Sequence, residues 1–89
     1  MAKDKRYITV RLLMEAGYVT SFSQIFEHMP LSVVAIDFGS NYVRFKRLVA
    51  NPSRLRLRDI FILARLFDIP EMTMISLIIA QLSKNKIKK

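Results

Sequence analysis

The stretch "LSVVAIDFGSNYVRFKRLVANP", residues 31–52, joins two short apolar segments through Gly39-Ser40-Asn41, and only the second segment carries cations. Gly39 suits the left-handed backbone angles that turn a chain sharply after a helix. Ala35 supplies a small side chain where two crossing helices would otherwise be held apart. The stretch therefore predicts two helices, over residues 31–38 and 42–49, joined by a tight turn in the layout of a helix-turn-helix.

The second of these helices has a predicted inner and a predicted outer face. Asn41 precedes it and can cap its first turn. Phe45, Leu48 and Val49 follow helical spacing and are expected to seat the helix on the rest of the domain. This arrangement leaves a mostly polar set facing solvent: Tyr42, Val43, Arg44, Lys46 and Arg47.

Periodicity near 3.6 residues continues through most of the chain and predicts further helices. An extra N-terminal helix is expected over about residues 7–16, ending before Gly17. The capping-box pair Ser21 and Gln24 starts a short helix that continues through Ile25 and Phe26. Asn51-Pro52 breaks the chain before an exposed basic loop over residues 53–56. A helix over residues 57–67 follows, then a last helix from Pro70 and a flexible basic tail over residues 83–89. We predict one all-α domain, residues 1–89, a compact bundle of five to six short helices.

The same periodicity predicts which side chains form the core. In the first helix the expected buried positions are Ile8, Leu12 and Met14. In the later helices they are Leu57, Ile60, Phe61, Ala64 and Phe67, then Ile75, Ile78, Ile79 and Leu82. Met29, Met72 and Met74 are expected to fill remaining gaps in the core.

Charge is the strongest functional signal in the composition. The chain of 89 residues has a net charge of +8, and residues 44–58 hold six cations and no acid. A cationic cluster in a folded region favours a polyanion, most often a nucleic acid. With one histidine, no cysteine and seven acids, the sequence offers little for a metal site or an acid–base pair, so we predict no enzyme, no metal and no cofactor. No small-molecule substrate is evident.

Two further expectations concern location. The charged N-terminus "MAKDKRYITV" lacks the apolar core of a signal peptide, and no apolar run approaches the roughly 20 residues that span a bilayer. The absence of cysteine suits a reducing compartment. We therefore expect a cytoplasmic protein with no membrane partner.

Over about residues 21–82 the sequence resembles the lambda-repressor-like (Cro/C1-type, XRE) family of helix-turn-helix DNA-binding domains. "LSVVAIDFG" resembles the first motif helix, "SNYVRFKRL" the recognition helix, and "LRDIFILARLFDIPEMTMISLI" the pair of helices that follows. The resemblance implies a sequence-specific transcriptional regulator of bacterial or phage type, with double-stranded DNA as its partner.

The resemblance also implies roles for individual residues. Base edges and adjacent phosphates would be met by Asn41, Tyr42, Val43, Arg44 and Lys46. The DNA backbone would be met by Arg47, Arg54 and Arg56. Two departures stand out: Ser32 lies near the place where the family often has a phosphate-clamping Gln, and Ser40 replaces the usual apolar residue after the turn glycine.

Three alternatives stay open on the sequence alone. The same fold can serve as a protein-interaction module, as in an antitoxin-like or co-regulator subunit, without specific DNA binding. The C-terminal segment "MTMISLIIAQLSKNKIKK" could lie on a membrane surface, although so small a core needs its apolar residues. Finally, surplus apolar surface on the first or last helix could support a homodimer, which regulators use to read two half-sites.

Overall fold

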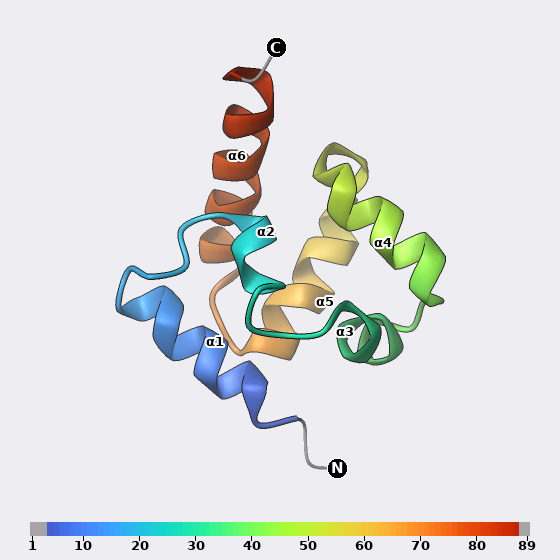
Figure 1. Ribbon diagram of the computed structural model, residues 1–89, viewed down its shortest axis with the longest axis horizontal. Helices are drawn as coiled ribbons and strands as arrows, with labels where there is room; N and C mark the ends of the chain where they lie inside the picture. The colour runs from blue at the N-terminus through green and yellow to red at the C-terminus, as the bar shows by residue number, and fades with distance from the viewer. Residues whose placement is uncertain (1–3, 88–89) are drawn as a thin grey trace.

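The computed structural model describes residues 4–87, and within them the chain is helical with no strand, as predicted (Figure 1). Six α-helices and one short 3₁₀ turn follow one another: α1 (Arg6–Glu15), α2 (Phe22–Ile25), α3 (Leu31–Phe38), α4 (Tyr42–Ala50), η1 (Pro52–Arg54), α5 (Leu57–Phe67) and α6 (Glu71–Ile87). The predicted bounds of α3 and α5 are confirmed, and α4 is one residue longer than predicted.

Local chemistry explains why α3 and α4 begin and end where they do. Gly39 adopts φ +89°, and the chain closes α3 with two backbone hydrogen bonds, from Gly39 N–H to the Ile36 carbonyl (3.0 Å) and from Ser40 N–H to the Ala35 carbonyl (3.0 Å). Asn41 then caps α4, because its side-chain oxygen accepts a hydrogen bond from the backbone N–H of Arg44 (2.8 Å). The turn between the two helices is therefore only three residues long.

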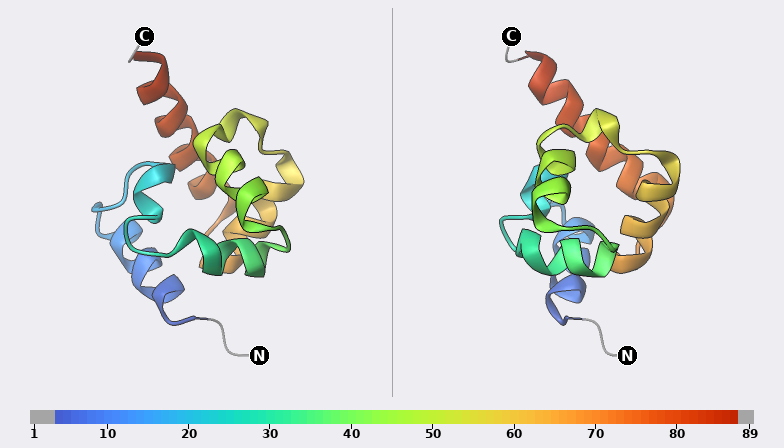
Figure 2. Two further views of the ribbon diagram at one scale, coloured as in Figure 1. Left: turned by 45° about the vertical axis from the view of Figure 1, so that its right-hand side comes forward. Right: turned by 90° about the vertical axis from the view of Figure 1, so that its right-hand side faces the viewer.

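The helices pack in neighbouring pairs around one core. α3 packs against α4 and α5 packs against α6, while α2 contacts both α4 and α6. Figures 1 and 2 show α1 on the side of the molecule away from α4, and the C-terminal half of α6 extending beyond the other helices. η1 packs against both α4 and α6, so it connects the helix-turn-helix pair to the last helix.

The core draws at least one side chain from every helix. Ala35 of α3 is 1% exposed and belongs to the core. Phe45 of α4 is fully buried, and its ring lies 5.1 Å from Phe38 and 6.0 Å from Phe26, centroid to centroid. These aromatic contacts fix α4 on the bundle by its inner face.

Several predicted core positions are wrong. Ile8 and Leu12 of α1 are each 53% exposed, because α1 buries Tyr7 and Val10 instead. The other predicted core residues that prove exposed are Leu57 (61%), Phe61 (45%), Met72 (70%) and Ile79 (56%). The predicted Ala64 and Phe67 on α5 and the predicted Met74 and Ile78 on α6 are buried, and Leu63 and Leu77, which were not predicted, are buried with them.

Two predicted loops also need correction. The predicted basic loop over residues 53–56 is exposed at Ser53, Arg54 and Arg56, as expected, but it is partly structured, since the buried Pro52 starts the 3₁₀ turn that includes Arg54. The predicted flexible tail over residues 83–89 is helical through Ile87, as the end of α6. Lys88 and Lys89 lie outside the described residues.

Candidate nucleic-acid interface

The outer face of α4 is the first part of the candidate site. Tyr42, Val43, Arg44, Lys46 and Arg47 are all exposed, as predicted, on a helix whose inner face is seated by Phe45. Leu48 and Val49 are half-buried, which confirms them as part of that inner face. The Lys46 ammonium lies 5.9 Å from the centre of the Tyr42 ring, so these neighbouring side chains form a cation–π pair.

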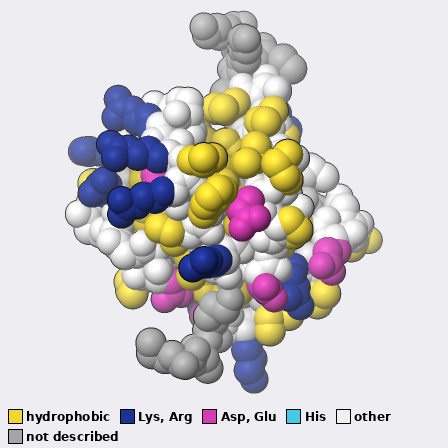
Figure 3. All heavy atoms as spheres, turned by 180° about the vertical axis from the view of Figure 1, so that it is seen from behind, with side chains coloured by type: hydrophobic (Ala, Val, Ile, Leu, Met, Phe, Trp, Pro, Cys, Tyr) yellow, Lys and Arg dark blue, Asp and Glu magenta, His cyan; other side chains and the backbone are white. Residues whose placement is uncertain are grey.

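A cavity of about 300 Å³ beside α4 is the second part of the site, and we call it the basic cavity. Its lining combines side chains from α3, α4, η1 and the start of α5: Phe38, Arg44, Arg47, Leu48, Arg54, Arg56 and Asp59. Four of the predicted DNA-contacting residues are thus brought together by the fold. Seen from behind, arginine and lysine side chains gather at one edge of the molecule (Figure 3).

Asp59 is the one acidic residue that lines the basic cavity, and its carboxylate is already hydrogen-bonded. The Asp59 carboxylate accepts a hydrogen bond from the backbone N–H of Arg56 (3.0 Å) at the start of α5. A carboxylate in the first turn of a helix is stabilised by the helix dipole and by such N–H groups. The cavity therefore combines four guanidinium groups, a capping carboxylate and two apolar side chains, which suits a phosphate group attached to a less polar body.

Three residues that line the basic cavity were not predicted as site residues. Leu48 was expected only to seat α4 on the domain, and Phe38 and Asp59 were not among the predicted site residues. The position of Asp59 three residues after Arg56, at the start of a helix, was the available signal, because acids are favoured there.

The remaining predicted site residues lie around the basic cavity rather than in its lining. Asn41 is exposed at the cap of α4, and Tyr42, Val43 and Lys46 project from the same helix. Ser32 is exposed in the first turn of α3. The predicted residues therefore include one group that lines the cavity and another on the exposed parts of α3 and α4.

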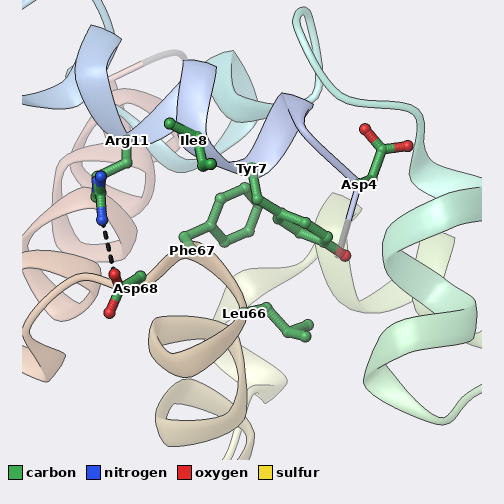
Figure 4. A pocket seen from close by; sticks show the side chains of 7 residues that line it. All are labelled: Asp4, Tyr7, Ile8, Arg11, Leu66, Phe67 and Asp68. Atoms are coloured by element: carbon green, nitrogen blue, oxygen red, sulfur yellow. Dashed lines mark hydrogen bonds and ion pairs between the residues drawn. The ribbon is translucent and has the colours of Figure 1, made fainter. Parts of the chain in front are cut away.

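A second cavity of about 260 Å³ lies between α1 and the end of α5 (Figure 4). The Tyr7 ring meets Phe67 edge-on with centroids 4.9 Å apart, and the Tyr7 hydroxyl donates to the Asp37 carboxylate of α3 (2.7 Å). At the other end, Arg11 forms an ion pair with Asp68 (2.6 Å). These contacts join α1 to α3 and α5, so the cavity is a by-product of how the N-terminal helix is held.

Because Tyr7 is buried, the stability of the fold should vary with pH in the alkaline range. Burial, and next the hydrogen bond to Asp37, raise the pKa of Tyr7 well above its ordinary value of 10.0. Above that ordinary value the unfolded chain loses the Tyr7 proton while the folded chain keeps it, so the free energy of unfolding falls as pH rises. At pH values below 10.0, Tyr7→Phe should lower the free energy of unfolding by about 1 kcal/mol, because the hydrogen bond to Asp37 is lost.

We expect urea denaturation to show that the stability gap between wild type and Tyr7→Phe narrows above a pH of about 10. Tyr18→Phe is the matched control, because Tyr18 is 75% exposed and its ring should contribute little. A gap that stays constant from neutral to strongly alkaline pH would contradict the proposed burial and pairing of the phenol.

No group of three or more His, Cys, Asp and Glu side chains in residues 4–87 is placed to hold a metal ion. Over the same residues no helix is both long and apolar enough to cross a membrane.

No known protein family matches this chain, and no curated protein and no solved structure matches it either.

Proposed function

We propose that this protein is a sequence-specific DNA-binding transcriptional regulator of bacterial or phage type, acting on double-stranded DNA in the cytoplasm. The observation that carries the proposal is the two-sidedness of α4: Phe45 is fully buried, while Arg44 and Lys46 on either side of it project into solvent. A nine-residue helix held in this way is the element that reads bases in helix-turn-helix proteins.

The dimensions and groups of α4 suit the major groove. An α-helix with its side chains is about 10–12 Å across and the major groove of B-DNA is about 12 Å wide. Arg44, in the first turn of α4, is the best candidate for a bidentate contact to guanine, and Asn41 or Tyr42 for adenine or a phosphate. We expect Ser32, which is exposed in the first turn of α3, to make a weaker phosphate contact.

The basic cavity supplies the positioning contacts in this proposal. Arg47 lies on α4, Arg54 in η1 and Arg56 at the N-cap of α5, and all three line one cavity next to α4. Contacts to phosphates fix the register of a protein on the duplex, while contacts to base edges select the sequence. The DNA backbone flanking the major groove would then lie along the basic cavity while α4 enters the groove.

Selection of bound duplexes from a random pool tests this function directly. We expect wild type to enrich one motif, and Arg44→Ala to lose preference at one base pair, by about 1–3 kcal/mol. Arg65→Ala is the control: it removes the same charge from an exposed α5 position outside the basic cavity, and should leave the motif unchanged.

One observation favours a second function, that of a protein-interaction module without specific DNA binding. Val43 is 58% exposed and Tyr42 is 46% exposed, so the outer face of α4 is also partly apolar, as in a protein interface. This function predicts a random pool without enrichment, weak binding to every duplex, and tight binding to an acidic protein. The selection experiment therefore separates the two functions.

A further inference from the structure

The four arginines of the basic cavity have no acidic partner in the described part of the chain. Within residues 4–87 none of their guanidinium groups forms an ion pair. Asp59 is the acid in the lining, so the cavity carries a net charge of +3, that is, four cations less one carboxylate. A single DNA phosphate carries one negative charge and neutralises a minor part of this. Positive charges that converge without partners attract anions.

We propose that the basic cavity binds a nucleoside diphosphate, and that this ligand competes with the DNA backbone for the same arginines. The binding of the ligand is independent of the proposed function, whereas the competition rests on it. The charge, the lining and the size of the cavity favour this occupant.

The charge of the ligand matches that of the cavity. At neutral pH two linked phosphates carry about −2.5 to −3, because the terminal phosphate contributes about −1.5 to −2 and the inner one about −1. This balances the +3 of the lining. Arginine also suits such a ligand, because its planar guanidinium group can donate two parallel hydrogen bonds to phosphate oxygens.

The apolar part of the lining suits the base of a nucleotide. Phe38 and Leu48 are half-buried, and both line the cavity. The Phe38 ring lies 5.1 Å from that of the buried Phe45, centroid to centroid, which holds it against the core. The bases of a duplex are stacked inside it and cannot reach this wall when the backbone lies along the cavity. The base of a free nucleotide can pack on an aromatic side chain.

Asp59 suits the sugar of a ribonucleotide. Its Oδ2 atom accepts the hydrogen bond from the Arg56 backbone N–H (3.0 Å), and its Oδ1 atom accepts none within the described residues. A carboxylate repels the phosphates of DNA. The hydroxyl groups of a ribose are donors, and one of them can pair with Oδ1. A ribonucleotide therefore accounts for an acid in the lining that a phosphate alone does not explain.

The size of the cavity limits the ligand. Its volume of about 300 Å³ lies at the lower end of the range for small-molecule sites, roughly 300–1,000 Å³. It suits one nucleotide rather than a longer chain. The second cavity, between α1 and α5, is lined by Arg11 and by two acids, Asp4 and Asp68, so it does not offer a comparable site for phosphates.

Isothermal titration calorimetry of the full chain tests the site, at constant ionic strength and without divalent cations. The probes are ADP, inorganic pyrophosphate and adenosine. We expect ADP to bind, and pyrophosphate to bind roughly 10-fold more weakly because it lacks the contact of the base. Adenosine should show no measurable binding, because it lacks the phosphates that the arginines hold.

Variants of the lining should separate its two parts. Arg47→Gln and Arg54→Gln should each weaken ADP binding roughly 10-fold, because each removes a charged donor. Arg58→Gln is the matched control, since Arg58 is exposed close to these arginines in the chain but does not line the cavity. Phe38→Leu should remove most of the difference between ADP and pyrophosphate. Unchanged binding of pyrophosphate would show that the cavity of this variant is intact.

Fluorescence anisotropy with a labelled duplex tests the competition at the same ionic strength. ADP at about ten times its Kd should lower the apparent affinity for the duplex roughly 10-fold, as expected for two ligands that exclude each other. Adenosine at the same concentration is the control and should leave the affinity unchanged.

The outcomes separate this inference from the proposed function. No binding of ADP, or equal affinities for ADP and pyrophosphate, would overturn the nucleotide site and leave DNA binding intact. An equal loss of ADP binding in Arg58→Gln and Arg47→Gln would also overturn it, because general positive charge would then hold the ligand. A duplex affinity that ADP does not change would overturn the competition. A chain that binds ADP but no duplex would support the site and count against the proposed function.

Discussion

Phe45→Ala should lower the free energy of unfolding by about 3–5 kcal/mol, as expected for the loss of a fully buried phenylalanine. The Phe45 side chain is 0% exposed and contacts the rings of Phe26 and Phe38, so its removal leaves a cavity between α2, α3 and α4. Native domains are stable by only about 5–15 kcal/mol, so this loss removes a large share of the total. Urea denaturation followed by circular dichroism measures it.

Val43→Ala is the matched control, because Val43 belongs to the same helix but is 58% exposed. Its effect should stay within about 0.5 kcal/mol of wild type. If Phe45→Ala fails to fold, Phe45→Leu keeps most of the volume and should cost about 1–1.5 kcal/mol. Equal stability of Phe45→Ala and Val43→Ala would show that Phe45 does not seat α4, and would remove the basis for an outward-facing recognition helix.

The ends of the helices were predictable because they depend on neighbouring residues in the chain. Gly39 provides the left-handed backbone angle that ends α3, and Asn41 provides the oxygen that caps α4. Both effects act within a few residues and need no tertiary information. The outer face of α4 was predictable for a similar reason: three cations at positions 44, 46 and 47 cannot be buried without partners, so Phe45 must point inward.

The buried faces of α1, α5 and α6 were not predictable in the same way. α6 carries apolar residues on most sides, so more than one stripe satisfies the helical period. The sequence therefore allowed Ile79 as a core position, whereas packing against α2, α5 and η1 leaves Ile79 exposed and buries Leu77 together with the predicted Met74.

The basic cavity could be predicted only in part. The sequence showed that Arg47, Arg54 and Arg56 are close along the chain and are expected at the surface. Their convergence depends on η1, which turns the chain after Asn51 and packs against α4. Phe38 joins the lining because α3 packs beside α4, a contact that periodicity does not reveal.

Neutralising Arg47, Arg54 and Arg56 together should weaken binding to every duplex by on the order of 100-fold at moderate salt. If about six cations of one copy neutralise phosphates, the slope of log affinity against log salt on a one-half-site duplex should be near −5. Removing three of them should make the slope shallower by about 2.7, because each contact contributes about 0.9. Fluorescence anisotropy titrations over a range of salt concentrations measure both quantities.

The control must remove the same charge from elsewhere on the surface. Lys5, Arg65 and Lys84 are exposed and lie outside the basic cavity, so their replacement by Gln also takes the net charge from +8 to +5, that is, three fewer cations. If binding depends on the basic cavity, the control variant keeps the wild-type salt dependence of affinity and the preferred motif. The cavity variant keeps the motif, but its affinity depends less steeply on salt. An equal loss of affinity and of salt dependence in both variants would mean that DNA is attracted by the overall positive charge. The arginines that converge beside α4 would then have no specific part in positioning the DNA.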